Sequence, residues 1–323
     1  MLKDFPSRLP STVLITRHDK IGDFILALPL CKAIKDQYPE IRVGILVSEV
    51  NYELANSFPF IDFVILYGAN FLATAREIRR EHPDLSVSCY IDNRLGALLL
   101  IAGIPIRIAP ATKIAQVFFN RCLNQRRSRV EKQEWQYNIE LASALLPSLS
   151  FKPPLVSFPS PQTKHNRVIF HPGSGGSSEG NLRLVDYLRL ARKAATIPGL
   201  EVVFTFGPND YLLLEQVQSE IDFPATIIAE PMKLIDFCKF ISRSLLFVST
   251  STGPMHLAGS VNTPTLSFFG ASLFASNKRW SPINELAYQS NFLIEPDYDS
   301  ELIDRIERRL IQLLTSPKPT GVR

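Results

Sequence analysis

The sequence predicts an α/β protein of two successive domains, each built on a parallel sheet covered by helices. The chain has 323 residues, about twice the common size of a domain. Short apolar and β-branched runs alternate with longer helical patterns, which is typical of parallel strands buried on both faces. A stretch with five prolines, residues 147–161, interrupts this alternation near the middle of the chain.

The first half alternates four predicted strands with helical segments. Each predicted strand is a short, continuous apolar or β-branched run, which favours a buried strand. An amphipathic helix closes this half before the proline-rich stretch. We predict strands at residues 12–16, 42–47, 63–67 and 85–91, and helices from residue 23 onward and at residues 52–57, 71–81, 93–102 and 135–146.

The alternation restarts after the proline-rich stretch. Proline lacks an amide donor and resists regular structure, so we place the linker there and expect domains at residues 1–150 and 151–323. The last predicted helix has a strong apolar stripe and is a candidate to pack back toward the first domain. Strands are predicted at residues 168–170, 202–206, 226–228, 245–249 and 265–269, and helices at residues 184–195, 211–220, 232–242, 255–261 and 300–314.

Composition argues against several protein classes. The net charge is +4, which is too mild for a protein that coats nucleic acid, so no nucleic-acid partner is expected. The four cysteines form no CxxC pair and no metal-binding motif is present, so we expect neither a disulfide scaffold nor a metal. The N-terminus lacks an apolar signal core, and the longest uncharged apolar run, residues 95–106, is too short to span a membrane. A soluble, cytoplasmic protein is therefore expected.

A first candidate site is residues 17–23 (RHDKIGD), between the first predicted strand and the first predicted helix. Gly22 allows a sharp turn. Asp23 falls beside a helix N-terminus, where a carboxylate is favoured by the helix dipole. One interpretation is a simple N-cap. The other is a general base that takes a proton from an acceptor hydroxyl.

Two loops of the second half are candidates for anion binding. Residues 171–178 (HPGSGGSS) combine glycine and serine directly after a predicted strand, so backbone amides could approach a phosphate closely. Residues 249–256 (STSTGPMH) form a hydroxyl-rich loop that opens a helix, with Pro254 suited to the first helical position. A flexible connection and a structural His256 are the alternatives. Two such loops in one domain favour a diphosphate site.

A basic stretch at residues 121–132 carries four arginines against one glutamate. Arginine clusters bind phosphate or carboxylate groups in bidentate geometry, so this stretch is a candidate for an anionic acceptor. A solvated loop is the alternative. The four arginines are Arg121, Arg126, Arg127 and Arg129.

Three sequence blocks together resemble the ADP-heptose:lipopolysaccharide heptosyltransferases, glycosyltransferase family nine. Residues 17–39 (RHDKIGDFILALPLCKAIKDQYP) resemble the family's opening block, and residues 171–181 (HPGSGGSSEGN) resemble its glycine-rich loop. Residues 251–270 (STGPMHLAGSVNTPTLSFFG) resemble its longest and most specific block, and residues 280–282 (WSP) resemble the motif that often follows it.

The resemblance implies a GT-B fold, in which two Rossmann-like domains with parallel sheets face each other across a cleft. It implies an inverting transfer of heptose from ADP-heptose, with no metal and no cofactor. The first domain would bind the acceptor, a lipid A–core glycolipid, and the second the nucleotide-sugar donor. The protein would then be cytoplasmic and peripheral on the cytoplasmic face of the inner membrane. We expect a monomer.

The resemblance also implies roles for individual residues. Asp23 would be the general base. Lys20 and the four arginines of residues 121–132 are assigned to the acceptor. The donor would contact residues of the two loops and two further side chains, namely Ser174, Gly175, Gly176, Ser177, Arg183, Asp210, Ser251, Thr252, Gly253, Pro254, Met255 and His256.

Three departures from the family pattern leave the donor open. Ser251 stands where members usually carry aspartate, and the lysine that often follows the glycine-rich loop is missing unless Arg183 replaces it. The acidic residue near the ribose is displaced, and Asp210 is the nearest candidate. The alternatives are the same fold with another nucleotide-sugar donor, a protein that binds nucleotide sugars or lipopolysaccharide precursors without catalysis, and a sugar-nucleotide epimerase.

Overall fold

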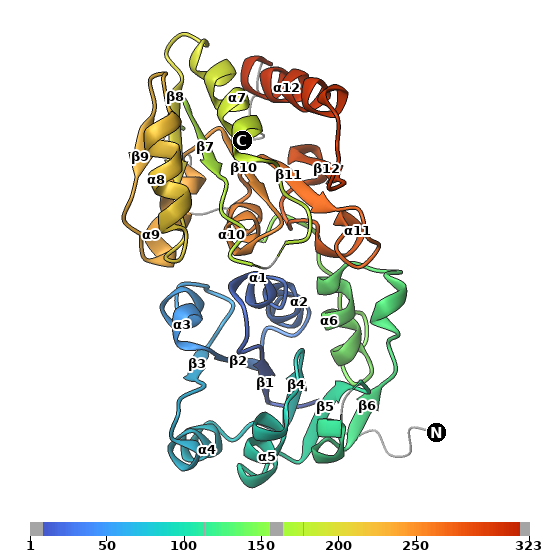
Figure 1. Cartoon of the computed structure of the whole chain (residues 1–323). Coiled ribbons are helices and arrows are strands. Elements are labelled where there is room, and N and C mark those ends of the chain that lie inside the picture. The colour runs from blue at the N-terminus through green and yellow to red at the C-terminus, as the bar shows by residue number, and fades with distance from the viewer. Residues whose placement is uncertain (1–8, 113, 156–163, 177, 317–323) are drawn as a thin grey trace. The chain divides into compact units, whose positions relative to one another are not determined.

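The computed structural model describes residues 9–112, 114–155, 164–176 and 178–316. The chain divides into two compact units, Met1–Leu155 and Val156–Arg323 (Figure 1). The division falls inside the proline-rich stretch where the sequence suggests the linker. Each unit is an α/β domain with its own parallel sheet.

The first unit contains a six-stranded parallel sheet in the order β3-β2-β1-β4-β5-β6. The central strand β1 is buried along its whole length, because helices cover both of its faces. On one face Leu14 packs with residues of α4 and α5, and on the other Val13 and Ile15 are also fully buried. The strands are β1 (Thr12–Thr16), β2 (Arg42–Val47), β3 (Phe63–Leu66), β4 (Leu85–Ser88), β5 (Ile106–Pro110) and β6 (Arg121–Leu123).

The helix predicted from residue 23 onward is two helices in the structure. Its first turn belongs to α1, and a two-residue turn then separates α1 from α2. Pro29 has no amide hydrogen to continue the α1 ladder, and it occupies the first turn of α2, where none is needed. The helices of the first unit are α1 (Ile21–Ile25), α2 (Leu28–Gln37), α3 (Glu49–Ala55), α4 (Phe71–Arg80), α5 (Asn93–Ile101) and α6 (Glu134–Ser143), with short 3₁₀ turns η1 (Ile114–Phe118) and η2 (Arg127–Arg129).

The second unit repeats the architecture with the sheet order β12-β11-β10-β7-β8-β9. All of its strand pairs are parallel. The strands are β7 (Arg167–His171), β8 (Glu201–Thr205), β9 (Thr226–Ile228), β10 (Leu246–Thr250), β11 (Thr265–Gly270) and β12 (Gln289–Ile294), and the helices are α7 (Leu184–Ala195), α8 (Tyr211–Glu220), α9 (Leu234–Ser242), α10 (Gly253–Ser260), α11 (Asn277–Trp280) and α12 (Ser300–Thr315), with a 3₁₀ turn η3 (Leu286–Tyr288).

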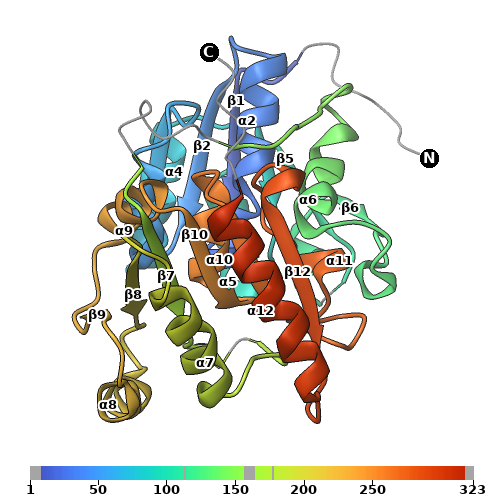
Figure 2. The same ribbon diagram turned by 90° about the horizontal axis from the view of Figure 1, so that it is seen from above.

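The last helix, α12, lies beside α7 (Figures 1 and 2). Its apolar residues Ile303, Ile306 and Leu310 are buried in the core of the second unit. Polar contacts tie the same two helices together, since Arg189 of α7 reaches acidic residues of α12. The apolar stripe of α12 is thus used within its own unit. The suggested return of this helix toward the first unit stays a prediction.

A membrane span has no candidate in the described part of the chain, where each helix is either too short or too polar to cross a bilayer.

Candidate functional site

Both sheets have the strand order of a Rossmann fold. Counted within each unit, the strands lie in the order third, second, first, fourth, fifth and sixth. Connections leave the first and fourth strands in opposite directions, so a crevice forms beyond their carboxyl ends, and ligands bind there in open α/β sheets. These positions are the ends of β1 and β4 in the first unit, and of β7 and β10 in the second. The loop that contains Gly175 begins there, as do the loops that lead to Asp23 in α1 and to Thr252 at the start of α10.

Asp23 lies in the first turn of α1, directly after the loop that follows β1. The N-cap position of this helix belongs to Lys20, whose side chain makes no capping hydrogen bond. The interpretation of Asp23 as an N-cap is therefore wrong. Its carboxylate instead accepts a hydrogen bond from the guanidinium of Arg17.

Arg17 is the centre of a buried charge network. Its side chain is about 5% exposed and contacts the carboxylates of Asp19, at 2.7 Å, and Asp23. It also donates to the carbonyl of Cys89 at 3.1 Å, and lies 3.7 Å from Glu134 of α6. Glu134 is 2% exposed and pairs in turn with Arg127 at 2.5 Å. This network, Asp19–Arg17–Asp23 with Glu134 and Arg127, is called the Arg17 network below.

Burial raises the pKa of Asp23 to about 6. The cation of Arg17 opposes this shift, while the negative charges of Asp19 and Glu134 add to it. The physical reason for the rise is that water is largely excluded from the carboxylate, which disfavours its charged form. A carboxylate with a pKa near the operating pH is suited to accept a proton during a reaction.

A second pair of side chains joins the ends of β1 and β4. His18 Nε2 lies 2.8 Å from Asp92 Oδ2, and Asp92 also caps α5 by accepting from the Leu95 amide at 2.7 Å. Burial lowers the pKa of His18, which favours the neutral form of its ring. With a proton on Nε2 facing Asp92, the other nitrogen, Nδ1, is an acceptor. It is buried without a partner among the residues that the structure describes.

Sequence reasoning missed Glu134 and Asp92. Asp92 carried a usable signal, since it follows a predicted strand as Asp23 does and caps the next helix. Glu134 carried none, because only the fold brings α6 to the end of β1. Arg17 stood inside the first candidate motif, but its role as the common partner of three carboxylates needs the structure.

The loop after β7 presents open backbone at its tip. Gly175 and Gly176 have φ angles of 53° and 68°, a region that favours glycine, and a Cβ at either position would meet nothing within 4 Å. Ser174 is half-buried at the start of this tip. Ser177 lies outside the described residues. The geometry suits close approach of an anion to backbone amides.

Arg183 and Asp210, predicted to contact the donor, have partners within the second unit. Arg183 pairs with Asp186 at 2.9 Å, and its guanidinium lies 4.4 Å from the centre of the Tyr298 ring. Asp210 accepts from the Gly207 amide at 2.7 Å and packs against Gly173, where an added Cβ would overlap its carboxylate. Each therefore makes structural contacts within the second unit, and the carboxylate of Asp186 balances the charge of Arg183.

The loop after β10 leads into α10 through Thr252, which takes the N-cap position with an extended backbone. The first amides of a helix have no acceptor within it, which leaves those of Gly253 and Met255 for a ligand, while Pro254 has none. Ser251 is half-buried and donates its amide to Phe268.

His256 is buried, but it is not the fully hydrogen-bonded structural histidine of the alternative interpretation, and its contact with the donor stays a prediction. Burial lowers its pKa to about 3, so the ring is neutral. Its Nδ1 is buried without a partner among the described residues.

The two loops of the second unit contact each other. The hydroxyls of Ser178 and Thr250 lie 2.6 Å apart, and Thr250 also donates to the carbonyl of Gly180. The loops thus form one surface at the ends of β7 and β10. The prediction that they lie together is consistent with this contact.

The basic stretch divides in the structure. Arg127 is 11% exposed, and its guanidinium is held by Glu134 and by Gln125, 2.7 Å from its side-chain oxygen. It is therefore committed to the Arg17 network rather than offered to a ligand, which corrects the grouping of the four arginines. Arg126 and Arg129 are exposed, Arg121 is half-buried on β6, and Lys20 is exposed beside Asp23.

Comparisons with known proteins agree with this architecture. The sequence model of glycosyltransferase family 9 (heptosyltransferase) matches residues 123–300. A Haemophilus influenzae protein, itself provisionally assigned as a glycosyltransferase, is 32% identical over 300 residues and 85% of this chain, and 86% of its own length is covered. Lipopolysaccharide heptosyltransferase 3 of Escherichia coli is 22% identical over 286 residues, with 80% of this chain and 84% of the relative covered.

Among solved structures, the ADP-heptose lipopolysaccharide heptosyltransferase II of E. coli superposes with a TM-score of 0.78 at 17% identity. The superposition covers 94% of this chain and 98% of that one. This likeness confirms the predicted fold class, GT-B, with two Rossmann-like domains. Together with the sequence matches, it shows that the chain belongs to glycosyltransferase family 9, the heptosyltransferases, and is a glycosyltransferase.

Proposed function

We propose that the chain transfers heptose from ADP-heptose to an inner-core lipopolysaccharide acceptor, with Asp23 as the general base. The observation that carries this proposal is the place of Asp23, a carboxylate in the first turn of α1 beyond the central strand β1, whose pKa burial raises to about 6. The names of its relatives support the substrates, since two of them are called a lipopolysaccharide heptosyltransferase and an ADP-heptose lipopolysaccharide heptosyltransferase.

The proposed step is a single displacement. The carboxylate of Asp23 takes the proton of an acceptor hydroxyl while the oxygen of that hydroxyl bonds to the anomeric carbon of the donor sugar. The bond from that carbon to the diphosphate breaks, and its electron pair leaves with ADP. Because the acceptor enters opposite the leaving group, the configuration at the anomeric carbon is inverted.

Groups positioned around the diphosphate must stabilise the negative charge that develops on it as the bond breaks. The amides at the start of α10 and the open glycine tip of the β7 loop can supply it, since backbone amides at a helix N-terminus and in such turns bind anions. We assign no metal to this step. His18 Nδ1, as a buried acceptor without a partner in the described structure, is a candidate to receive a hydrogen bond from an acceptor hydroxyl.

A different nucleotide-sugar donor is the second candidate, and one observation favours it. Arg183, which could replace the missing loop lysine, is already paired with Asp186 and stacked on Tyr298. Ser251 adds no charge to the donor loops. The donor site is thus less cationic than the family pattern implies.

A donor panel tests the proposal. Purified enzyme would be incubated with truncated core lipopolysaccharides and, in separate reactions, ADP-heptose, UDP-glucose or GDP-mannose. Mass spectrometry of the glycolipid should show the addition of one heptosyl residue from ADP-heptose only. Turnover with another donor only would contradict heptose as the transferred sugar. It would leave the fold and the proposed role of Asp23 unaffected.

We also propose that the enzyme works as a peripheral protein at the cytoplasmic face of the inner membrane, because its proposed acceptor is anchored in lipid. We expect it to act there as a monomer. Co-sedimentation with inner-membrane vesicles that contain the acceptor should exceed co-sedimentation with vesicles that lack it. Recovery with the acceptor-containing vesicles no higher than in a control without vesicles would contradict the peripheral assignment.

A further inference from the structure

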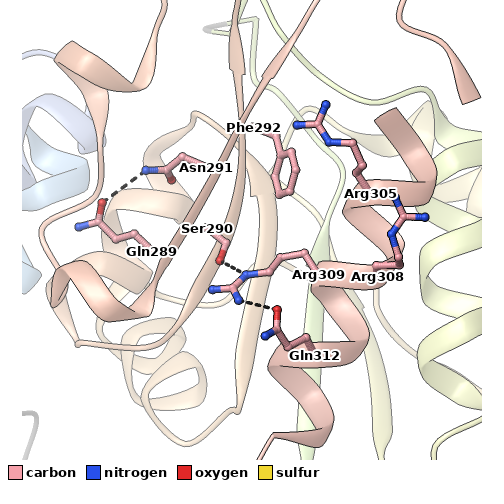
Figure 3. A pocket seen from close by; sticks show the side chains of 8 residues that line it. All are labelled: Gln289, Ser290, Asn291, Phe292, Arg305, Arg308, Arg309 and Gln312. Atoms are coloured by element: carbon pink, nitrogen blue, oxygen red, sulfur yellow. Dashed lines mark hydrogen bonds between the residues drawn. The ribbon is translucent and has the colours of Figure 1, made fainter. Parts of the chain in front are cut away.

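The second unit carries a pocket that the proposed transfer does not use. It lies between the edge strand β12 and α12 and has a volume of about 500 Å³ (Figure 3). None of the residues assigned above to the donor, the acceptor or the base lines it. Its charged and aromatic lining consists of Arg305, Arg308, Arg309 and Phe292.

Two acidic residues of α12 face α7, while Glu301 lies on the same side of the helix as Arg305 and Arg308. Asp304 and Glu307 face α7 and pair with Arg189 at 2.6 and 2.9 Å. Arg305 and Arg308 remain exposed, and no carboxylate of the described chain, Glu301 one turn earlier included, lies within ion-pair distance of either. The pocket is therefore bordered by two exposed guanidinium groups that form no ion pair with a described residue.

Arg309 is held in a fixed position in the same pocket. Its Nε donates to Ser290 Oγ at 2.9 Å, and its Nη1 donates to Gln312 Oε1 at 2.7 Å (Figure 3). The planar guanidinium group binds phosphate through two parallel hydrogen bonds, which makes arginine the common residue for phosphate recognition. The pocket thus offers three guanidinium groups to a phosphate, one held in place by hydrogen bonds and two exposed.

Phe292 gives the pocket an apolar wall. It lies on the same side of β12 as Ser290, and its half-buried ring faces the region between β12 and α12 (Figure 3). The carbon-bound hydrogens of a sugar ring pack well on an aromatic face, while hydroxyl and amide groups such as those of Ser290 and Gln312 satisfy sugar hydroxyls. An inorganic ion would not need such a wall.

We propose that the pocket between β12 and α12 binds a phosphate group carried on a sugar. The site is separate from the donor loops in the sheet. Ser290 belongs to β12, which lies two strands away from β10, and it pairs with Leu266 of the intervening strand β11. The donor loops instead start beyond the ends of β7 and β10. The inference depends neither on the base nor on the donor sugar.

Isothermal titration calorimetry with glucose 1-phosphate and with glucose tests the proposal on the full-length protein. The test variant is Arg305→Gln/Arg308→Gln, which removes two exposed cations that form no hydrogen bond or ion pair with the described part of the chain. The matched control is Arg76→Gln/Arg80→Gln on α4, which removes the same charge from exposed positions of the other unit. The donor site is unchanged in both variants, so binding there is common to all three proteins.

The expected result is that glucose 1-phosphate binds the wild type and the control, and that the test variant binds it at least tenfold more weakly or loses one binding event. Glucose should bind all three proteins weakly and equally. Equal titrations of glucose 1-phosphate by the wild type and the test variant would overturn the proposal. A second outcome would also overturn it: phosphatidylglycerol vesicles bind the wild type but not the test variant, and glucose 1-phosphate binds neither protein. The pocket would then recognise the phosphate of a lipid surface and not that of a sugar. Circular dichroism checks that both variants are folded.

Discussion

One buried guanidinium controls the carboxylate on which the proposed chemistry depends. Arg17 contacts Asp19, Asp23 and Glu134, so its single positive charge is shared among three negative ones. Burial destabilises the charged form of the Asp23 carboxylate by more free energy than a cation shared among three carboxylates restores. The pKa of Asp23 therefore rises even though an arginine contacts it. The Arg17 network thus leaves Asp23 able to take a proton near neutral pH.

The pH profile of transfer tests this control. Because Asp23 must be deprotonated to act as a base and its pKa is about 6, kcat/KM should fall as the pH drops through about 6. In Glu134→Gln, one negative charge near Asp23 is lost and Arg17 attracts Asp23 more strongly. The pKa of Asp23 then falls, and the acidic limb of the profile should move to lower pH.

The control for that variant is Glu131→Gln, an exposed glutamate of the same region with its side chain 61% exposed. Its profile should coincide with that of the wild type. An acidic limb that stays in place or moves to higher pH in Glu134→Gln, with the protein folded, would contradict the role given to the network.

At the residue scale, the sequence identified Asp23 as a candidate base but did not predict its surroundings. Asp23 was identifiable because a carboxylate after a glycine at the start of a helix is a recognisable local pattern. Its interpretation as an N-cap failed because Lys20 occupies that position. Arg127 was grouped with exposed arginines because local sequence does not show that Glu134, on a later helix, buries it.

At the scale of elements, the loop after β7 is held by a close backbone approach at Gly180. A Cβ there would overlap the backbone of Phe269 and Gly270, which are too rigid to move aside cheaply. We therefore expect Gly180→Ala to lower the free energy of unfolding by about 1–3 kcal/mol, as overpacked sites do. Chemical denaturation measures this.

Gly68→Ala is the matched control for the loop substitution. The nearest atom to an added Cβ at Gly68 is 3.8 Å away, which is ordinary van der Waals contact. Its unfolding curve should stay close to that of the wild type. A Gly180→Ala protein as stable as this control would show that the loop tolerates a side chain at the contact with β11.

The elements that the sequence missed share a physical cause. β12 is an edge strand of mixed polarity, QSNFLI, so it lacks the continuous apolar run of a central strand. β6 is only three residues long and lies inside the basic stretch. β5 begins after a proline and contains Arg107. The buried central strands β1, β7 and β10 were recognisable because both of their faces are covered.

At the scale of the whole molecule, one strand order occurs twice. The fold class was predictable because alternating apolar strands and helices leave few arrangements other than two parallel α/β domains. The strand order was not, since hydrophobic patterning does not say which strands pair. That order places the proposed base at one crevice and the proposed diphosphate loops at another, in separate units.

The placement of the two proposed sites in separate units predicts how ADP changes the Tm of the protein. The loops proposed to hold the diphosphate belong to the second unit, whereas Asp23 belongs to the first. ADP at a hundred times its Kd should therefore stabilise the wild type and Asp23→Asn equally, by about 2.7 kcal/mol. Differential scanning fluorimetry measures the shift in Tm. Loss of the shift in Asp23→Asn alone would contradict the assignment of the two units.

The central claim is that Asp23 accepts the proton of the acceptor hydroxyl. Its most direct test is the rate of heptose transfer from ADP-heptose to truncated core lipopolysaccharide, followed by product mass, in Asp23→Asn and in Asp36→Asn. Asp36 is an exposed aspartate of α2 in the same unit and serves as the control. We predict that Asp36→Asn transfers like the wild type and that kcat of Asp23→Asn falls about 10²- to 10⁴-fold. A folded Asp23→Asn protein that transfers heptose within a few-fold of the wild-type rate would contradict the account.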